Sequence, residues 1–374
     1  MNYQNDKRIV LTLDAGGTNF VFVAMQGGKQ IGESVRLPSE AKDLDKSIGN
    51  MKAGFRALIE KLDTKPSAIS FAFPGPADYP NGIIYNVGNL PAFAGGVALA
   101  DALQDEFNIP VFINNDGDLF VYGEAIAGFL PKINKALEDA GSVKRYKRLF
   151  GVTLGTGFGG GLVNNGELYI GDNSNGLEVW LMRNYTRPEC FAEEGACIRA
   201  VQKAYARCVG LEDYTKFTPK DIEDIALGKL DGNPQAAKDA YAEMGQVLGE
   251  IFAAAATLFD SLIVIGGGLS YGHKLFMESA MNHLNGSIQS YDGKGIPRLT
   301  QKAFNLEDPS QFAQFLKGEQ KEIKVYASNR SIIADPSKRI GIGITTLGTS
   351  EAVAVGAYAF ALNEIDKRGH SVLS

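Results

Sequence analysis

Near its N-terminus the chain carries the stretch Asp14-Ala-Gly-Gly-Thr-Asn19, between the apolar runs Ile9–Leu13 and Phe20–Ala24. This order predicts a strand, a glycine turn and a second strand. Glycines let backbone N–H groups approach an anionic ligand closely, because no Cβ intervenes. A hairpin whose turn happens to be rich in glycine would show the same pattern, so the stretch alone leaves both interpretations open.

A second copy of this pattern begins at Phe150. The apolar run Phe150–Leu154 leads into Gly155-Thr-Gly-Phe-Gly-Gly-Gly161, and the turn Asn164-Asn-Gly166 follows. Two Gly/Thr loops of this kind could grip a polyphosphate from two sides, and Asp14 could hold a hydrated Mg²⁺ beside the phosphate oxygens. The duplication therefore predicts ATP chemistry.

Composition narrows the class of protein. The 374 residues suffice for two domains with their own cores. A formal charge of −6 argues against a general nucleic-acid binder, which needs Lys and Arg to neutralise phosphates. We expect no secretory signal and no membrane span, because the N-terminus is polar and no apolar run approaches about 20 residues. Three cysteines favour a reducing, cytoplasmic location over a disulfide framework.

Strands and helices alternate along the chain. Helical periodicity covers about residues 44–62, a strand covers 68–73, and the pairs Thr218-Pro219 and Asn233-Pro234 predict helix starts, the second helix running to about Phe259. A further helix is expected from about residue 119, and a closing one over 349–366. We therefore predict an α/β fold of two related domains flanking a cleft, one formed by residues 1–118 plus 349–374 and the other by 119–348. Residues 286–339 show no clear pattern.

Asp116 follows the short apolar strand Pro110–Ile113. Open α/β sheets place ligand sites at the carboxyl ends of such strands. A carboxylate there could accept the proton of a substrate hydroxyl as its oxygen attacks a γ-phosphoryl group. Asp116 could instead cap the following helix, and Asp118 is a rival for the catalytic role.

Two other nucleotide motifs are excluded. Residues 155–160 contain G-x-G-x-x-G, but a strand rather than a helix is expected to follow, so the dinucleotide-binding interpretation fails. The P-loop pattern G-x-x-x-x-G-K-[ST] does not occur in the sequence. The run Gly266–Gly268 after the apolar strand Leu262–Ile265 could let an adenine or ribose lie against bare backbone. A tight connection from strand to helix would explain it nearly as well.

Taken together and in this order, the motifs resemble the ROK family (repressors, open reading frames and sugar kinases) of the actin–hexokinase–Hsp70 ATPase superfamily. The resemblance covers most of the chain. It rests on Asp14–Asn19, Phe73-Pro-Gly-Pro76, Asn89-Leu-Pro91, Asn115-Asp116 with Gly123-Glu124, Gly155–Gly160 and Ile265-Gly-Gly-Gly-Leu269.

The resemblance implies two RNase H-like (actin-like ATPase) domains and a set of site residues. Asp116 would be the general base, and Asn115, Gly75, Asn89 and Glu178 would bind the sugar. The nucleotide phosphates would lie on a first loop made of Gly16, Gly17, Thr18 and Asn19 and a second made of Gly155, Thr156 and Gly157. Gly266, Gly267 and Gly268 would form the adenosine loop.

The sequence departs from the family pattern in one region. In the family's Glu-Ile-Gly-His signature the His binds substrate, whereas here the stretch reads Glu178-Val-Trp-Leu181. Of the cysteine cluster that holds a structural zinc in the family, only Cys190 and Cys197 are present, so we expect no zinc. Arg199 replaces a sugar-contacting Glu; it would favour an anionic sugar if it faces the pocket, or it points to solvent.

The leading hypothesis is an ATP- and Mg²⁺-dependent transferase that phosphorylates a hydroxyl of a hexose or hexose derivative. The alternatives are a non-catalytic sugar-sensing protein without a DNA-binding domain and a degenerate kinase. The expected partners are a small-molecule sugar and, from the resemblance, a second copy of the chain in a homodimer. Neither nucleic acid nor membrane is expected as a partner.

Overall fold

The computed structural model describes residues 3–75, 77–85, 88 and 90–371. Its contacts divide the chain into two compact units. Unit 1 comprises Met1–Ala127, Leu168–Gly176 and Ser350–Ser374, and unit 2 comprises Gly128–Glu167 and Leu177–Thr349. These bounds differ from the predicted boundary at residues 118/119, because the helix that starts at Asp116 continues without a break and belongs wholly to unit 1. No helix among the described residues is long and apolar enough to cross a membrane.

Unit 1 is built on a five-stranded sheet in the order β3-β2-β1-β4-β8, counted over the described residues. Strands β1 and β2 form the predicted antiparallel hairpin, and β4 and β8 continue the sheet parallel to β1. The strands are β1 (Ile9–Ala15), β2 (Asn19–Gln26), β3 (Lys29–Pro38), β4 (Ala68–Ala72) and β8 (Val111–Asn114). A small sheet of β5 (Ala77–Asp78), β6 (Ile83–Ile84) and β7 (Val97–Ala98) lies in the same unit.

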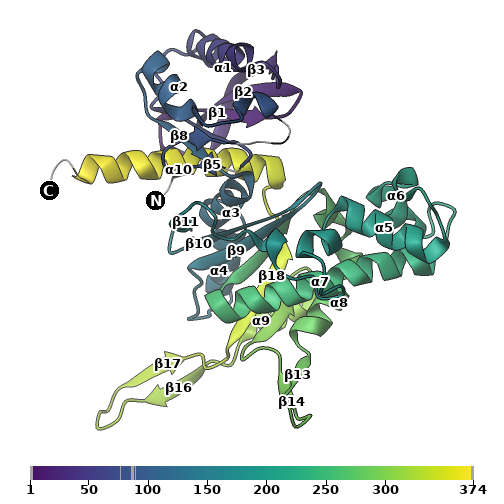
Figure 1. Ribbon diagram of the computed structural model, residues 1–374. Coiled ribbons are helices and arrows are strands. Elements are labelled where there is room, and N and C mark those ends of the chain that lie inside the picture. Colours follow the sequence, from purple (N-terminus) through teal and green to yellow (C-terminus); the bar gives the residue numbers. More distant parts are fainter. Residues whose placement is uncertain (1–2, 76, 86–87, 89, 372–374) are drawn as a thin grey trace. The chain divides into compact units, whose positions relative to one another are not determined.

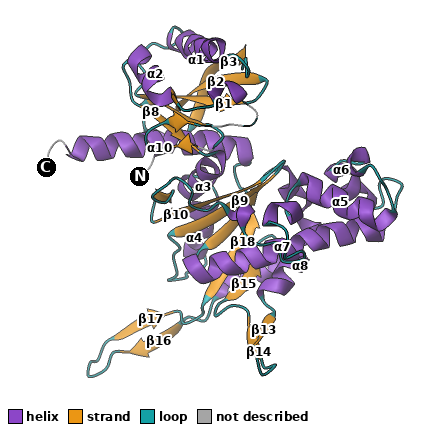
Figure 2. Ribbon diagram, in the orientation of Figure 1, coloured by secondary structure: helices purple, strands orange, loops and turns teal. Residues whose placement is uncertain are grey.

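Helices cover both faces of this sheet (Figures 1 and 2). On one face Phe71 of β4 packs against Phe55 of α1, with ring centroids 6.1 Å apart. On the other face Phe112 of β8 packs against Phe360 of α10, also at 6.1 Å. The helices of unit 1 are α1 (Leu44–Ile59), α2 (Leu99–Phe107), α3 (Asp116–Ile126) and α10 (Thr349–Ser371), whose first residue belongs to unit 2.

Unit 2 repeats this plan. Its sheet has the order β11-β10-β9-β12-β18-β15, with β9 and β10 as the antiparallel hairpin and β12 and β18 parallel to β9. The last two residues of β11 are counted with unit 1. The first five strands of this order correspond one by one to the sheet of unit 1, so the predicted duplication is confirmed. The strands are β9 (Arg148–Leu154), β10 (Phe158–Asn164), β11 (Glu167–Tyr169), β12 (Leu262–Gly266), β18 (Arg339–Ile344) and β15 (Lys302–Asn305).

Helices again cover both faces. Phe150 of β9 packs against Phe259 of α7 on one face, and the ring of Phe129 from α4 lies over Gly343 of β18 on the other. The predicted helix starts are confirmed, because Thr218 forms a capping box before α6 and the Asn233 side chain accepts the N–H of Ala236 at the start of α7. The helices are α4 (Phe129–Asp139), α5 (Ile198–Val209), α6 (Pro219–Ala226), α7 (Pro234–Phe259), α8 (His273–Leu284) and α9 (Pro309–Lys317).

The segment from residue 286 to 339 contains one edge strand, two hairpins and helix α9. Strand β15 joins the sheet beside β18. The hairpins β13–β14 (Ser287–Gln289, Gly295–Pro297) and β16–β17 (Lys321–Lys324, Ser331–Ala334) extend from the body of unit 2 (Figure 1). The strands of the two hairpins are short and contain no buried residue, so no alternation of apolar and polar side chains marks them in the sequence.

Two glycines let α3 and α10 approach within unit 1. A Cβ on Gly123 would lie 2.0 Å from the carbonyl oxygen of Ala352, and one on Gly356 would lie 2.0 Å from that of Leu119. Both are closer than any real contact. Since Asp116 opens α3, this crossing fixes the helix that carries it.

The substitution Gly123→Ala should lower the free energy of unfolding by about 2 kcal/mol, because the backbones must separate to admit the methyl group. Denaturant titration measures the change. The control is Gly49→Ala, a helical position with no atom within 4 Å of the new Cβ, where Ala should raise stability by about 1 kcal/mol. Equal effects of the two substitutions would contradict the role of the crossing.

Candidate functional site

Three loops of unit 1 meet at one edge of its sheet. Register pairs Asp14 of β1 with Ala72 of β4, and Ala72 with Asn114 of β8. Neighbouring strands lie about 4.8 Å apart, so the ends of β1 and β8 are separated by roughly 10 Å. The loops that follow carry the predicted residues Gly16–Asn19, Gly75 and Asn115–Asp116. The topology therefore gathers the first phosphate loop, one sugar loop and the candidate base.

The end of β8 is shaped by a helix cap. The Asn115 Oδ1 accepts the N–H of Gly117 at 2.8 Å, so Asn115 is the N-cap and α3 begins at Asp116, three residues before the predicted start. Asp116 Oδ1 also accepts this N–H at 2.8 Å. Asp116 is exposed, whereas Asp118 is only 7% exposed. Of the two carboxylates, Asp116 is the one that a substrate can reach.

Opposing effects act on the pKa of the Asp116 carboxyl group. Protein atoms packed around the side chain raise the pKa of its carboxyl group, and the nearby negative charge of Asp14 raises it further. The N–H of Gly117 opposes both by stabilising the carboxylate. A raised pKa makes this carboxylate a stronger base than an ordinary Asp.

Tyr79 joins these loops and was not predicted. Its hydroxyl donates to the carbonyl oxygen of Phe73 at 3.0 Å and accepts the side-chain N–H of Asn115 at 3.4 Å. A Cβ on Gly75 would lie 3.0 Å from the same oxygen. The hydroxyl thus links the Phe73–Gly75 loop to the residue beside Asp116. Asn89, the remaining predicted sugar contact of this unit, lies outside the described residues.

The first phosphate loop is held closed by Ser39, which also was not predicted. Gly16 N–H donates to Asn19 O at 3.1 Å across the turn. Ser39 donates its hydroxyl to Gly17 O at 2.6 Å and its N–H to Thr18 O at 3.0 Å. The Gly17 carbonyl is bound by Ser39, so the N–H of the exposed Thr18, which lies trans to it in the same peptide, points the opposite way.

The second phosphate loop, Gly155–Gly157, lies in unit 2 and is a similar turn, with Gly155 N–H donating to Gly157 O at 3.0 Å. It leads directly into β10, which confirms that a strand follows the glycines. Arg199 lies beside this loop and is paired with Glu193 and Glu194. That pairing does not favour the expected role of Arg199 toward an anionic sugar.

The loop Gly266–Gly268 lies against the same turn. Gly267 has a φ of +84°, and a Cβ there would lie 2.2 Å from the carbonyl oxygen of Leu154, the residue before Gly155. Its N–H donates to the Thr349 hydroxyl at 2.7 Å. Only glycine fits this position, and a Cβ on Gly268 or Gly155 would meet no atom within 4 Å. The backbone is therefore bare on both sides of the junction.

The remaining predicted residues of unit 2 differ in exposure. Glu178 is exposed and accepts a hydrogen bond from the indole of Trp180, and Leu181 is 59% exposed. Cys190 and Cys197 are free thiols, and burial raises the pKa of Cys197. Within the described ranges, no group of three or more His, Cys, Asp and Glu residues is placed to hold a metal ion.

Comparison with known proteins assigns the family. A profile described as the ROK family matches residues 10–303. The chain belongs to the ROK family. A crystal structure of a glucokinase from Parabacteroides distasonis is 50% identical to this ROK protein, with a TM-score of 0.90, and the match covers 97% of this chain and 99% of that one.

Other relatives are more distant. An N-acetyl-D-glucosamine kinase of Aliivibrio salmonicida is 28% identical over 69% of this chain and 83% of the relative. A glucokinase of Thermotoga maritima is 27% identical over 70% of this chain and 82% of the relative. A ROK family glucokinase from Streptomyces griseus, solved with glucose and AMPPNP, shares the fold with a TM-score of 0.57 and 17% identity, covering 93% and 98% of the two chains. The predicted α/β, actin-like ATPase fold of this ROK protein is confirmed.

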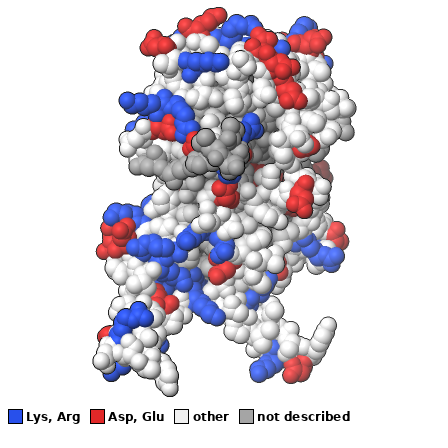
Figure 3. Space-filling model, turned by 90° about the vertical axis from the view of Figure 1, so that its left-hand side faces the viewer, with Lys and Arg blue, Asp and Glu red and all other residues white. Residues whose placement is uncertain are grey.

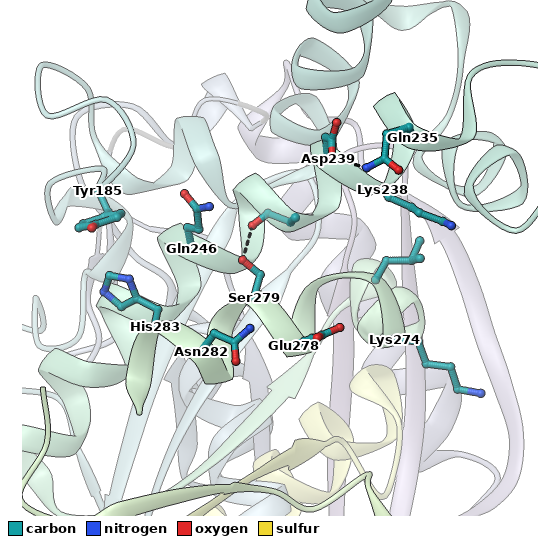
Figure 4. A pocket seen from close by; sticks show the side chains of 12 residues that line it. Tyr185, Gln235, Lys238, Asp239, Gln246, Lys274, Glu278, Ser279, Asn282 and His283 are labelled. Carbon is teal, nitrogen blue, oxygen red and sulfur yellow. Dashed lines mark hydrogen bonds between the residues drawn. The ribbon is translucent and has the colours of Figure 1, made fainter. Parts of the chain in front are cut away.

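A separate groove of about 720 Å³ runs between α7 and α8 in unit 2 (Figure 4). Tyr185 and His283 stand at one end of it, and the Ser279 hydroxyl donates to Ala242 O at 2.8 Å. The predicted site residues do not line this groove. On the face drawn in Figure 3, basic and acidic side chains are interspersed.

Tyr79→Phe should lower the free energy of unfolding by about 1 kcal/mol, because the Phe73 carbonyl and the Asn115 amide lose their shared partner. Tyr271→Phe is the matched control, since Tyr271 is 69% exposed. Urea titration of both variants measures the difference. If the two variants unfold at the same midpoint, the Tyr79 hydroxyl does not hold the loops.

Proposed function

We propose that this ROK protein transfers the γ-phosphoryl group of ATP to a hydroxyl of a hexose or hexose derivative, with Asp116 as the general base. The class of activity follows from the family: the chain is an ATP-dependent sugar kinase, as its relatives are named glucokinase and N-acetyl-D-glucosamine kinase. The single observation that supports the role of Asp116 is its place at the carboxyl end of β8, exposed and beside Asp14.

Asp116 acts on the acceptor hydroxyl. Its carboxylate accepts the hydroxyl proton while the sugar oxygen forms a bond to the γ-phosphorus, and the bond from that phosphorus to the β–γ bridging oxygen breaks to release ADP. Asn115, held by the Tyr79 hydroxyl, and Gly75 border the sugar. The raised pKa of Asp116 improves its proton affinity at this step.

Backbone groups bind the nucleotide. Thr18 of the first loop, and Thr156 and Gly157 of the second, have N–H donors whose preceding carbonyls are already paired within the protein, and the exposed Gly17 lies beside Thr18. Such donors suit phosphate oxygens. The open backbone at Gly155 and Gly268 suits the adenosine, because no atom lies within 4 Å of where a Cβ would stand; Gly266 and Gly267 belong to the same loop.

The residues also fit a magnesium ion. The Asp14 and Asp116 carboxylates are close enough for the charge of one to raise the pKa of the other. Within the described part of the chain neither is paired with Lys or Arg. Two unneutralised carboxylates are typical ligands for Mg²⁺ or its waters. When bound, the ion neutralises phosphate charge; we assign Asp14 as its residue, acting through water.

The proposal has four further parts: sugar contacts by Glu178 and Asn89, a homodimeric assembly, a cytoplasmic location and the lack of a nucleic-acid partner. The family resemblance supports the first two, and the cysteine count and net charge support the others.

Asp116→Asn should lower kcat by about 10²–10⁴-fold, because the amide cannot accept the proton. Affinity for ADP, measured by calorimetry, should be unchanged. Coupled assays of ADP release with glucose and N-acetyl-D-glucosamine measure the rates, and Asp105→Asn, an exposed carboxylate of α2, is the matched control. A wild type that releases no ADP with any sugar would favour a binding-only protein.

The pH profile should report on Asp116. Activity needs the carboxylate, so kcat/KM should fall as pH drops through its raised pKa, at a higher pH than an ordinary Asp would require. Asp14→Asn removes a charge that raises this pKa, so the acid limb of the residual activity should move to lower pH. An acid limb that moves to higher pH, or does not move, would contradict the coupling.

A further inference from the structure

Residues 190–199 of unit 2, where the sequence departs from the family's cysteine cluster, lie against the second phosphate loop. Ile198, the first residue of α5, donates its N–H to Gly155 O at 2.9 Å. Arg199 donates from Nη1 to Thr156 O at 3.3 Å. Gly157 O already accepts the N–H of Gly155. All three carbonyls of the loop therefore accept hydrogen bonds, and two of the three bonds come from the start of α5.

Glu193 holds the far side of the same loop. Its Oε2 accepts the N–H of Phe158 at 2.9 Å and would lie 2.9 Å from a Cβ on Gly157. Its Oε1 accepts from Arg199 Nη2 at 2.6 Å. One carboxylate thus bridges the end of the loop to the guanidinium that contacts its middle.

Arg199 and Lys203 carry two positive charges, which balance the negative charges of Glu193 and Glu194. Arg199 Nε donates to Glu194 Oε1 at 2.9 Å, and Lys203 donates to Glu194 Oε2 at 2.9 Å. Burial alone would lower the pKa of Arg199, but the hydrogen bonds to Glu193 and Glu194 outweigh it and raise the pKa. Two cations face two carboxylates, so Arg199 has no charge to spare for an anionic sugar. Without Arg199, the charge of Glu193 would stand uncompensated beside a loop meant for phosphate.

We propose that Arg199 is a positioning residue for the nucleotide: through Glu193 and the Thr156 carbonyl it fixes the Gly155–Phe158 turn and cancels the negative charge behind it. This inference rests on the proposed kinase function, since it assigns the loop to ATP phosphates. If Arg199 has this role, sugar binding does not depend on its side chain.

Arg199→Met should raise KM for ATP about tenfold, the effect of losing hydrogen bonds to a charged group, and leave KM for the sugar unchanged. Arg199→Lys should recover part of the loss, because one bond and the charge return. The double variant Arg199→Met, Glu193→Gln should bind ATP better than Arg199→Met alone, since the uncompensated charge is gone. Steady-state kinetics with ATP and sugar varied separately measure all four proteins.

The matched control is Arg207→Met. Arg207 lies in α5, as Arg199 does, and this substitution removes its ion pair with Glu243 of α7. It should change neither KM. Calorimetric titration with ADP tests the inference without phosphoryl transfer: weaker ADP binding by Arg199→Met supports it even if no sugar is phosphorylated, and a silent wild type in the kinase assay contradicts the proposed function alone.

Three results would overturn the inference. If Arg199→Met raised KM for the sugar and left KM for ATP unchanged, Arg199 would contact the sugar rather than support the phosphate loop. Kinetics and ADP affinity equal to those of Arg207→Met would leave it without a role in nucleotide binding. A double variant weaker than Arg199→Met would show that Glu193 does not repel phosphate.

Discussion

The register of three parallel strands is the constraint on which the unit 1 site depends. Backbone hydrogen bonds align Asp14, Ala72 and Asn114 across β1, β4 and β8, and each strand then hands over to a loop at the same edge. A slip of one residue in any strand would turn its side chains to the opposite face. The spacing of the proposed site residues therefore follows from the sheet and requires few direct contacts among their side chains.

The two units share this strand order but differ in the residues that follow the strands. In unit 1 the loops after β4 and β8 carry side chains with chemistry, ending in Asn115 and Asp116. In unit 2 the loop after β12 carries three glycines, and Gly267 packs so closely on Leu154 that no side chain fits. In the proposed site, unit 1 would therefore act through a carboxylate and an amide, and unit 2 through backbone groups.

The sequence was informative wherever the signal is local. The glycine turns, the Thr218 and Asn233 caps and the end of α7 at Phe259 all depend on neighbouring residues, and all were predicted correctly. The start of α3 was placed three residues late, because Asn115 rather than a later residue caps it. Tyr79, Ser39 and Glu193 were missed since each acts on a loop that its own sequence neighbourhood does not reveal. Arg199 was identified, but its pairing with Glu193 and Glu194 could only be seen once the turn between them had folded.

The hairpin β16–β17 has a consequence for how the protein behaves at high concentration. Both strands of a two-stranded sheet are edges, and this one shows the exposed cross-strand pair Ile323 and Ile332. Exposed apolar edges recruit strands from other chains into intermolecular ladders. Lys321, Glu322 and Lys324 make three of the four residues of β16 charged, and charged side chains on an edge strand oppose such pairing because it would desolvate them. The charged side chains of β16 thus offset the exposure of Ile323 and Ile332 and favour a hairpin that stays unpaired with other chains.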